Sequence, residues 1–121
     1  MSLRTDLLEK ARIEQIIGVV REDHAEVAEA VADAYARNGV RIIEITLTTP
    51  DAFELIAKLA ARYAEIDVVM AAGTVRSAND AALARRAGAR VIVSPHTDYQ
   101  VIEYANENDL LSVAGAGGRR T

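Results

Sequence analysis

The chain has 121 residues, a formal net charge of −4 and no cysteine. Half of its residues are hydrophobic and 26% are charged, a balance that favours one folded globular domain over a disordered chain. The net charge gives no electrostatic reason to expect nucleic acid or an anionic membrane as a partner. The lack of cysteine excludes disulfides and thiolate zinc sites.

Targeting signals are not evident in the sequence. No apolar run approaches the roughly 18 residues that a membrane span requires. Charged residues interrupt the apolar positions near the N-terminus, so this segment does not resemble a signal peptide. We therefore expect a cytoplasmic protein.

The first elements alternate between helix and strand. Apolar residues at helical spacing predict a helix up to about Glu14, and the apolar run 16–20 predicts a strand. Asp23 and Glu26 resemble a capping box that begins a second helix, which Asn38 and Gly39 end. The residues expected to form its buried stripe are Val27, Val31, Ala34 and Tyr35.

The next strand, 41–46, carries a carboxylate at Glu44 among aliphatic residues. Alternation places Ile42, Glu44 and Thr46 on one face, with Ile43 and Ile45 on the other. A lone carboxylate is costly to bury among aliphatics, so it requires a partner or a wet cavity. In a sheet with helices on both faces it would lie under a helix, whereas in a closed parallel barrel it would point into the lumen.

Three helices and three strands are predicted for the rest of the chain. Thr49 is the expected N-cap of the next helix, with Pro50 in its first turn. Its inward residues are expected to be Phe53, Ile56, Ala57 and Ala60. The later strands are predicted at 68–72, 91–94 and 111–114, and the intervening helices begin at the Ser77–Asp80 and Thr97–Gln100 capping boxes.

Strand starts near residues 16, 42, 68, 91 and 111 lie 20 to 26 residues apart, which indicates an α/β fold with a parallel sheet. Two architectures fit: a doubly wound domain of flavodoxin or receiver type, and the first five strands of a (β/α)₈ TIM barrel. The sequence lacks the functional residues expected of a doubly wound domain of either type. The loop after the first strand, 21–23, is not glycine-rich, and the third strand ends without a phosphoacceptor aspartate.

Four segments, each at a strand or its end, resemble the 2-keto-3-deoxy-6-phosphogluconate / 4-hydroxy-2-oxoglutarate aldolase family. They are Gly18–Arg21, Gly39–Thr46, Ala72–Val75 and Ala87–Pro95. The resemblance extends over most of residues 16–115 and implies a (β/α)₈ barrel that assembles as a trimer. It also implies cleavage of a small-molecule 2-keto-4-hydroxy acid to pyruvate and an aldehyde through a lysine Schiff base, with no metal or other cofactor.

The resemblance also implies roles for individual residues. Glu44 would be the general acid/base, which carbinolamine dehydration and aldol cleavage both need. A carboxylate in a dry lumen has its charged form disfavoured, so its pKa moves toward the working pH. Thr74 would donate its hydroxyl to the pyruvate carboxylate, with Gly73 allowing the backbone to come close. Arg21 would bind the same carboxylate or another anion through its planar fork.

The chain departs from the family pattern in two places. Many members have an arginine in the turn after the Glu-bearing strand, where this chain has Thr48, and Arg21 would take over that anion-binding role. The family's Schiff-base lysine lies on the sixth strand, beyond Thr121, whereas Lys10 and Lys58 lie in predicted helices. The glycine-rich segment 115–121 is interpreted as a truncation, an artificial end or a shifted reading frame, so the chain alone is expected to be inactive.

Each of these residues also has a purely structural interpretation. Glu44 could pair with an arginine, Arg21 could be a solvated flank of its strand, and Thr74 could only turn the chain. His24 and His96 follow strand ends, but with no fixed spacing they are interpreted as surface or capping residues rather than metal ligands. The functional alternative to an aldolase is a non-enzymatic flavodoxin-like module that self-associates or binds a small carboxylate.

Overall fold

The computed structural model describes residues 17–95 and 97–114, so the predicted N-terminal helix and His96 lie outside the described residues. Its five strands are β1 (Ile17–Val20), β2 (Ile42–Thr46), β3 (Val69–Gly73), β4 (Val91–Ser94) and β5 (Leu111–Ala114). Its helices are α2 (Ala25–Arg37), α3 (Ala52–Arg62), α4 (Ala78–Ala87) and α5 (Tyr99–Glu107). The predicted order of strands and helices is confirmed, and the fourth and fifth strands have the predicted bounds.

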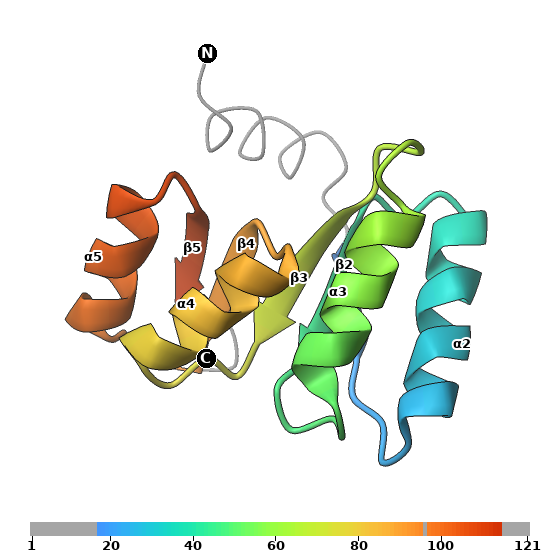
Figure 1. The fold of residues 1–121 in the computed structure, drawn as a ribbon, viewed down its shortest axis with the longest axis horizontal. Helices are drawn as coiled ribbons and strands as arrows, with labels where there is room; N and C mark the ends of the chain where they lie inside the picture. The colour runs from blue at the N-terminus through green and yellow to red at the C-terminus, as the bar shows by residue number, and fades with distance from the viewer. Residues whose placement is uncertain (1–16, 96, 115–121) are drawn as a thin grey trace.

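All four strand pairings are parallel, and the strands lie side by side in chain order, β1-β2-β3-β4-β5. Each right-handed crossover therefore moves in the same direction and places its helix on the same face of the sheet. Figure 1 shows α2, α3, α4 and α5 in this order along that face. A doubly wound sheet reverses its strand order and has helices on both faces, so the flavodoxin-like alternative is wrong and the barrel-type fold is confirmed.

The two faces of the sheet have different packing. Ile43 and Ile45 belong to the large core shared with the helices, together with α3 residues such as Ile56 and Leu59. A second cluster of buried residues comes only from the strands: Ile42, Ala71, Val91, Val93 and Leu111. The predicted alternation along β2 is therefore confirmed, and among the described residues no helix contributes to the cluster on the Glu44 face.

The predicted buried stripes of the first two described helices are correct in part: Val31 and Tyr35 of α2 and Phe53, Ile56 and Ala60 of α3 pack against the core, whereas Val27 and Ala57 are exposed. In α2 the fully buried residues are Ala28 and Ala32, whereas Val27 is 43% exposed. In α3 the fully buried residues are Ala52, Leu55, Ile56 and Leu59, so the prediction missed Ala52, Leu55 and Leu59. In α2 the fully buried positions are small residues, with the larger Val31 and Tyr35 packing alongside, whereas α3 also buries the large side chains of Leu55, Ile56 and Leu59.

Three of the four predicted helix starts also need correction. α2 begins after His24 without a side-chain cap, so the Asp23–Glu26 box does not form. The residue before α3 is Asp51, whose backbone is left-handed and which gives no side-chain cap, and the Thr49 hydroxyl lies 3.3 Å from the Thr46 hydroxyl. Asp98, rather than Thr97, caps α5 by accepting bonds from the Gln100 and Val101 amides. The Ser77 cap of α4 is confirmed by its bond from the Asp80 amide, 3.0 Å.

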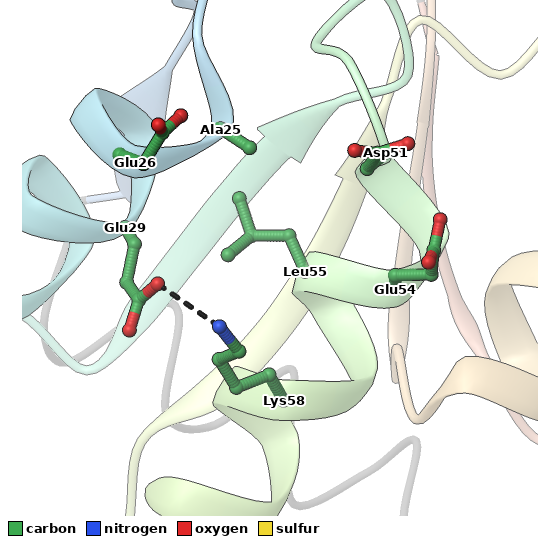
Figure 2. Close-up of a pocket in the computed structure, with 7 residues that line it drawn as sticks. All are labelled: Ala25, Glu26, Glu29, Asp51, Glu54, Leu55 and Lys58. Carbon is green, nitrogen blue, oxygen red and sulfur yellow. Dashed lines mark hydrogen bonds and ion pairs between the residues drawn. The ribbon is translucent and has the colours of Figure 1, made fainter.

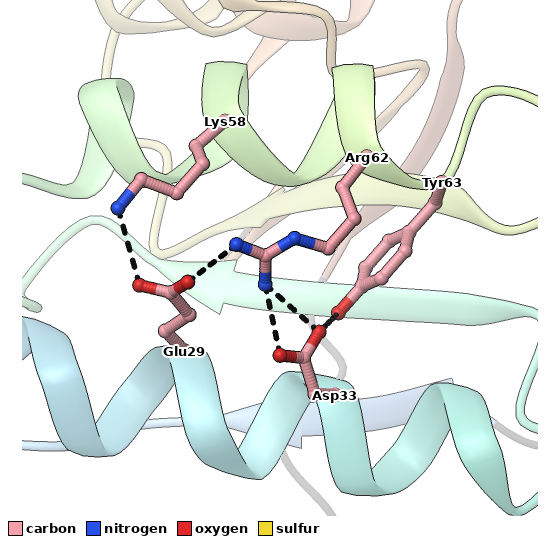
Figure 3. A network of polar contacts seen from close by, with 5 residues as sticks. All are labelled: Glu29, Asp33, Lys58, Arg62 and Tyr63. Carbon is pink, nitrogen blue, oxygen red and sulfur yellow. Dashed lines mark hydrogen bonds and ion pairs between the residues drawn. The ribbon is translucent and has the colours of Figure 1, made fainter.

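A polar network joins the outer surfaces of α2 and α3, as Figure 3 shows. The Arg62 guanidinium donates to Glu29 and to both oxygens of Asp33, and the buried Tyr63 hydroxyl donates to Asp33 over 2.5 Å. Burial opposes ionisation of Asp33, but the bonds from Tyr63 and Arg62 prevail and lower the pKa of this carboxyl. The network joins the two helices that cover β2 and leaves the opposite face of the sheet untouched.

Candidate functional site

Glu44 lies in the middle of β2 on the face that no described helix covers. Its neighbours across the sheet are Val19 on β1 and Ala71 on β3. Only 8% of the residue is exposed, although Val19 beside it is 46% exposed. The carboxylate is therefore withdrawn from bulk water, but it is not sealed beneath a helix.

A hollow of about 250 Å³ lies where β1 to β4 end, and Glu44 forms part of its wall. Arg21 follows β1 directly, and Thr74 follows β3 directly. The full lining is Val19, Arg21, Glu44, Thr74, Val93, Ser94 and Pro95. The carboxyl ends of parallel strands are where barrel enzymes place their active sites, so three of the five predicted site residues meet at the expected edge.

Burial raises the pKa of the Glu44 carboxyl, while the positive charge of Arg21 partly opposes that rise. The two side chains form no hydrogen bond or ion pair with each other, although other arginine–carboxylate contacts occur on the helices. Arg21 therefore acts on Glu44 through space and leaves the carboxylate open to a ligand. Because a raised pKa brings a carboxyl closer to the working pH, this arrangement suits Glu44 to both donating and accepting a proton.

Thr74 has a backbone φ of 59°, in the left-handed region that a β-branched residue rarely adopts. The Val75 amide after it donates to the Val93 carbonyl over 3.0 Å, so the chain turns across the end of β4. Unusual backbone conformations of this kind gather at functional sites. The turn places the half-buried Thr74 in the wall of the hollow.

The structure places the other two predicted site residues differently. Thr48 is exposed and lies outside the hollow, and its hydroxyl contacts the Thr46 hydroxyl at 3.0 Å. Gly73 also lies outside the lining, directly against the Glu44 side chain. Thr48 is thus separate from the group formed by Arg21, Glu44 and Thr74.

Four residues of the lining were not proposed from the sequence as site residues. Val19 and Val93 share the Glu44 face by strand alternation, so extending that pattern to the neighbouring strands would have found them. Ser94 and Pro95 end β4, and the Ser94 hydroxyl is buried without a hydrogen-bond partner among the described residues. Only the pairing of the strands brings these residues next to Glu44.

A larger hollow of about 370 Å³ lies between α2 and α3, as Figure 2 shows. It is mainly acidic, and Lys58 on its wall is paired with Glu29 at 3.2 Å. Lys58 therefore belongs to the helix layer and does not face Glu44. His24 is exposed, and the described residues contain no group of three acidic or histidine side chains placed to hold a metal.

Comparison with known proteins identifies the family. The sequence matches the family of KDPG and KHG aldolases over residues 7–117. The chain belongs to this family. It is 32% identical over 101 residues to a 2-dehydro-3-deoxy-phosphogluconate aldolase of Haemophilus influenzae, covering 84% of this chain and 47% of that protein. A Treponema pallidum protein of the same name is 35% identical over 99 residues, covering 82% and 45%.

Solved aldolase structures have the same fold. A KDPG aldolase of Zymomonas mobilis has a TM-score of 0.70 at 27% identity, covering 81% of this chain and 46% of that one. A Legionella pneumophila KDPG aldolase, with pyruvate captured as a covalent carbinolamine, has a TM-score of 0.69 at 25% identity, covering 81% and 47%. The chain thus spans about half the length of the aldolases it matches. None of its described helices is long and apolar enough to cross a membrane.

The raised pKa of Glu44 predicts how stability changes with pH. Between the unfolded value near 4.5 and the higher folded value, the native state binds more protons than the unfolded state. The free energy of unfolding therefore falls as pH rises through this window. Glu44→Gln removes that fall, so the variant gains stability relative to the parent as pH rises.

Urea unfolding at several pH values from 4 to 8 measures this difference. Glu54→Gln is the matched control, because Glu54 is exposed on α3 and lies outside the Glu44 hollow. It is expected to follow the parent closely. A Glu44→Gln curve that runs parallel to the parent across the whole range would contradict the prediction.

Proposed function

We propose that this protein is a class I aldolase, which cleaves a 2-keto-4-hydroxy acid to pyruvate and an aldehyde through a lysine Schiff base. The observation that carries the proposal is the position of Glu44, which is largely shielded from bulk water and lines a hollow at the carboxyl ends of the strands. Relatives are named 2-dehydro-3-deoxy-phosphogluconate aldolase and KHG/KDPG aldolase. We assign 2-keto-3-deoxy-6-phosphogluconate or 4-hydroxy-2-oxoglutarate as substrate on this basis.

Glu44 would move protons in two steps. As an acid it protonates the carbinolamine hydroxyl, which leaves as water and gives the Schiff base. As a base it then takes the proton of the substrate's C4 hydroxyl while the C3–C4 bond breaks. The bonding electrons pass to the iminium, the aldehyde departs, and protonation of the enamine at C3 followed by hydrolysis gives pyruvate.

Arg21 and Thr74 would hold the carboxylate of the keto acid. The Arg21 fork can donate two parallel hydrogen bonds to a carboxylate, and the Thr74 hydroxyl can donate a third. Both residues line the hollow together with Glu44. They would place the C2 carbonyl next to the proton donor.

The nucleophile of this mechanism is the lysine that the family carries on its sixth strand, a position beyond Thr121. Lys58 is unsuitable because it is an exposed α3 residue paired with Glu29. A Schiff-base lysine also needs a lowered pKa, which usually requires burial or a neighbouring cation. We therefore expect this chain to supply the acid/base and the anion-binding groups of the site.

A chimera tests this proposal. Residues 17–114 replace the equivalent stretch of the Haemophilus influenzae aldolase, which keeps the remaining half of that protein. The chimera is expected to release pyruvate from 2-keto-3-deoxy-6-phosphogluconate. A coupled assay with lactate dehydrogenase measures the pyruvate that is released. Borohydride reduction in the presence of pyruvate should add one pyruvate by intact mass.

The chain by itself serves as the control. With pyruvate and borohydride it is expected to leave Lys58 unmodified in peptide mapping. A chimera that folds, as judged by circular dichroism, but neither turns over substrate nor traps pyruvate would contradict the proposed function.

We extend the proposal to location and assembly. The protein is proposed to be cytoplasmic and to assemble as a homotrimer, both of which the family resemblance implies. Light scattering coupled to size-exclusion chromatography of the chimera measures the assembly state. A monomeric but active chimera would contradict the trimer and leave the chemistry standing.

A further inference from the structure

Gly73, the last residue of β3, lies against the carboxylate of Glu44. A Cβ atom built on Gly73 would lie 2.0 Å from Glu44 Oε2, 2.7 Å from Cδ and 2.9 Å from Cγ. These are the three nearest atoms, and all belong to Glu44. The space that the glycine leaves is thus filled by the Glu44 side chain.

Backbone conformation does not explain this glycine. The glycines with positive φ among the described residues are Gly39 and Gly88, and Gly73 is not one of them. Gly73 lies in a regular strand and pairs with Thr46 on β2. A residue with a side chain could adopt the same backbone, so space for Glu44 is the remaining requirement.

On the open face of β3 the side chains become smaller toward the carboxyl end of the strand, from Val69 through Ala71 to Gly73. Glu44 pairs with Ala71 in register, yet its carboxylate lies beside Gly73, two residues further along. The side chain therefore leans along the sheet toward the strand ends. This lean brings the carboxylate to the level of Thr74.

We propose that Gly73 is a positioning residue: the slot left by its missing side chain holds the Glu44 carboxylate at the strand ends, facing Arg21 and Thr74. The inference rests on the proposed function and deepens it, because it assigns to Gly73 the placement of the acid/base rather than contact with substrate. A methyl group at position 73 would occupy the place of Oε2 and move the carboxylate out of its slot.

The direction of the movement is defined by what surrounds Glu44. Ala71 and Gly73 of β3, Thr74 directly after it, and Val93 and Ser94 of β4 carry no charge. Arg21 after β1 is the charged side chain among the other residues that line the hollow. A displaced carboxylate therefore moves into the hollow, where more water and Arg21 both favour its charged form.

The test compares the full chain with Gly73→Ala by following the Glu44 side-chain carboxyl through a ¹³C NMR pH titration. The Gly73→Ala midpoint is expected to shift to lower pH than that of the parent. An unchanged midpoint in a folded variant would overturn the inference. This measurement needs no turnover, so its failure and the failure of the proposed aldolase activity are distinguishable.

A double-mutant cycle provides the second measurement. Gly73→Ala is expected to lower the melting temperature of the parent chain but to leave that of Glu44→Ala nearly unchanged, because the clash is gone. An equal loss in both backgrounds would overturn the inference. If Gly73→Ala alone fails to fold, a folded Glu44→Ala/Gly73→Ala variant supports it, and an unfolded one overturns it.

Gly18→Ala is the matched control. Gly18 is also a strand glycine without positive φ, but a Cβ there would meet the Tyr35 ring at 2.8 Å. The Gly18→Ala substitution is expected to lower the melting temperature to the same extent in the parent chain and in the Glu44→Ala variant. The Glu44 titration midpoint of this control is expected to match that of the parent.

Discussion

Glu44→Gln is expected to lower the kcat of the chimera by about 10²–10⁴-fold, the usual contribution of a general acid/base. The amide keeps the size and planar shape of the side-chain end, so it still fits against Gly73. It cannot donate an acidic proton to the carbinolamine or take one from the C4 hydroxyl. Loss of kcat with little change in KM is therefore the expected signature.

Steady-state kinetics with lactate dehydrogenase coupling measures this effect. Glu54→Gln is the control, because Glu54 is exposed on α3 and lies outside the site. It is expected to retain the parent kcat. A Glu44→Gln chimera with undiminished kcat would assign the proton transfers to another group.

Ile45→Ala is expected to lower the free energy of unfolding by about 2–5 kcal/mol. Ile45 follows Glu44 in β2, is fully buried and belongs to the core that the strands share with the helices. Truncation leaves a cavity behind the strand that carries the carboxylate. Urea unfolding of the chain measures the loss.

Val19→Ala is the comparison on the opposite face. Val19 lies beside Glu44 but is 46% exposed, so its truncation is expected to cost about 1 kcal/mol or less. Equal losses for the two variants would contradict the one-sided packing of this sheet. The pair thus separates the face that stabilises the fold from the face that carries the site.

The strands and their faces could be predicted because short apolar runs with period-two alternation are local patterns. The helix register could not be predicted equally well. Ala28 and Ala32 lie closest to the sheet while Val27 is exposed, since the distance between helix and sheet decides which residue fits. The predicted Thr49 cap also depends on tertiary structure: α3 begins only after Asp51, and the Thr49 hydroxyl contacts the Thr46 hydroxyl at 3.3 Å.

The candidate site was predicted in part. Arg21, Glu44 and Thr74 share one hollow because parallel strands bring their carboxyl ends to one edge. Thr48 lies outside it, since the turn after β2 directs its hydroxyl to Thr46. Their catalytic and binding roles remain predictions.

The sequence by itself determined the succession of strands and helices, the face on which Glu44 lies and the resemblance to one aldolase family. These features depend on neighbouring residues and on motifs, which a linear chain displays directly. Only the tertiary structure decided that all the described helices cover one face of the sheet, so that Glu44 lines a hollow on the other face. It alone also revealed the contact between Gly73 and Glu44, because a missing side chain has meaning only when the atoms that fill its space are known.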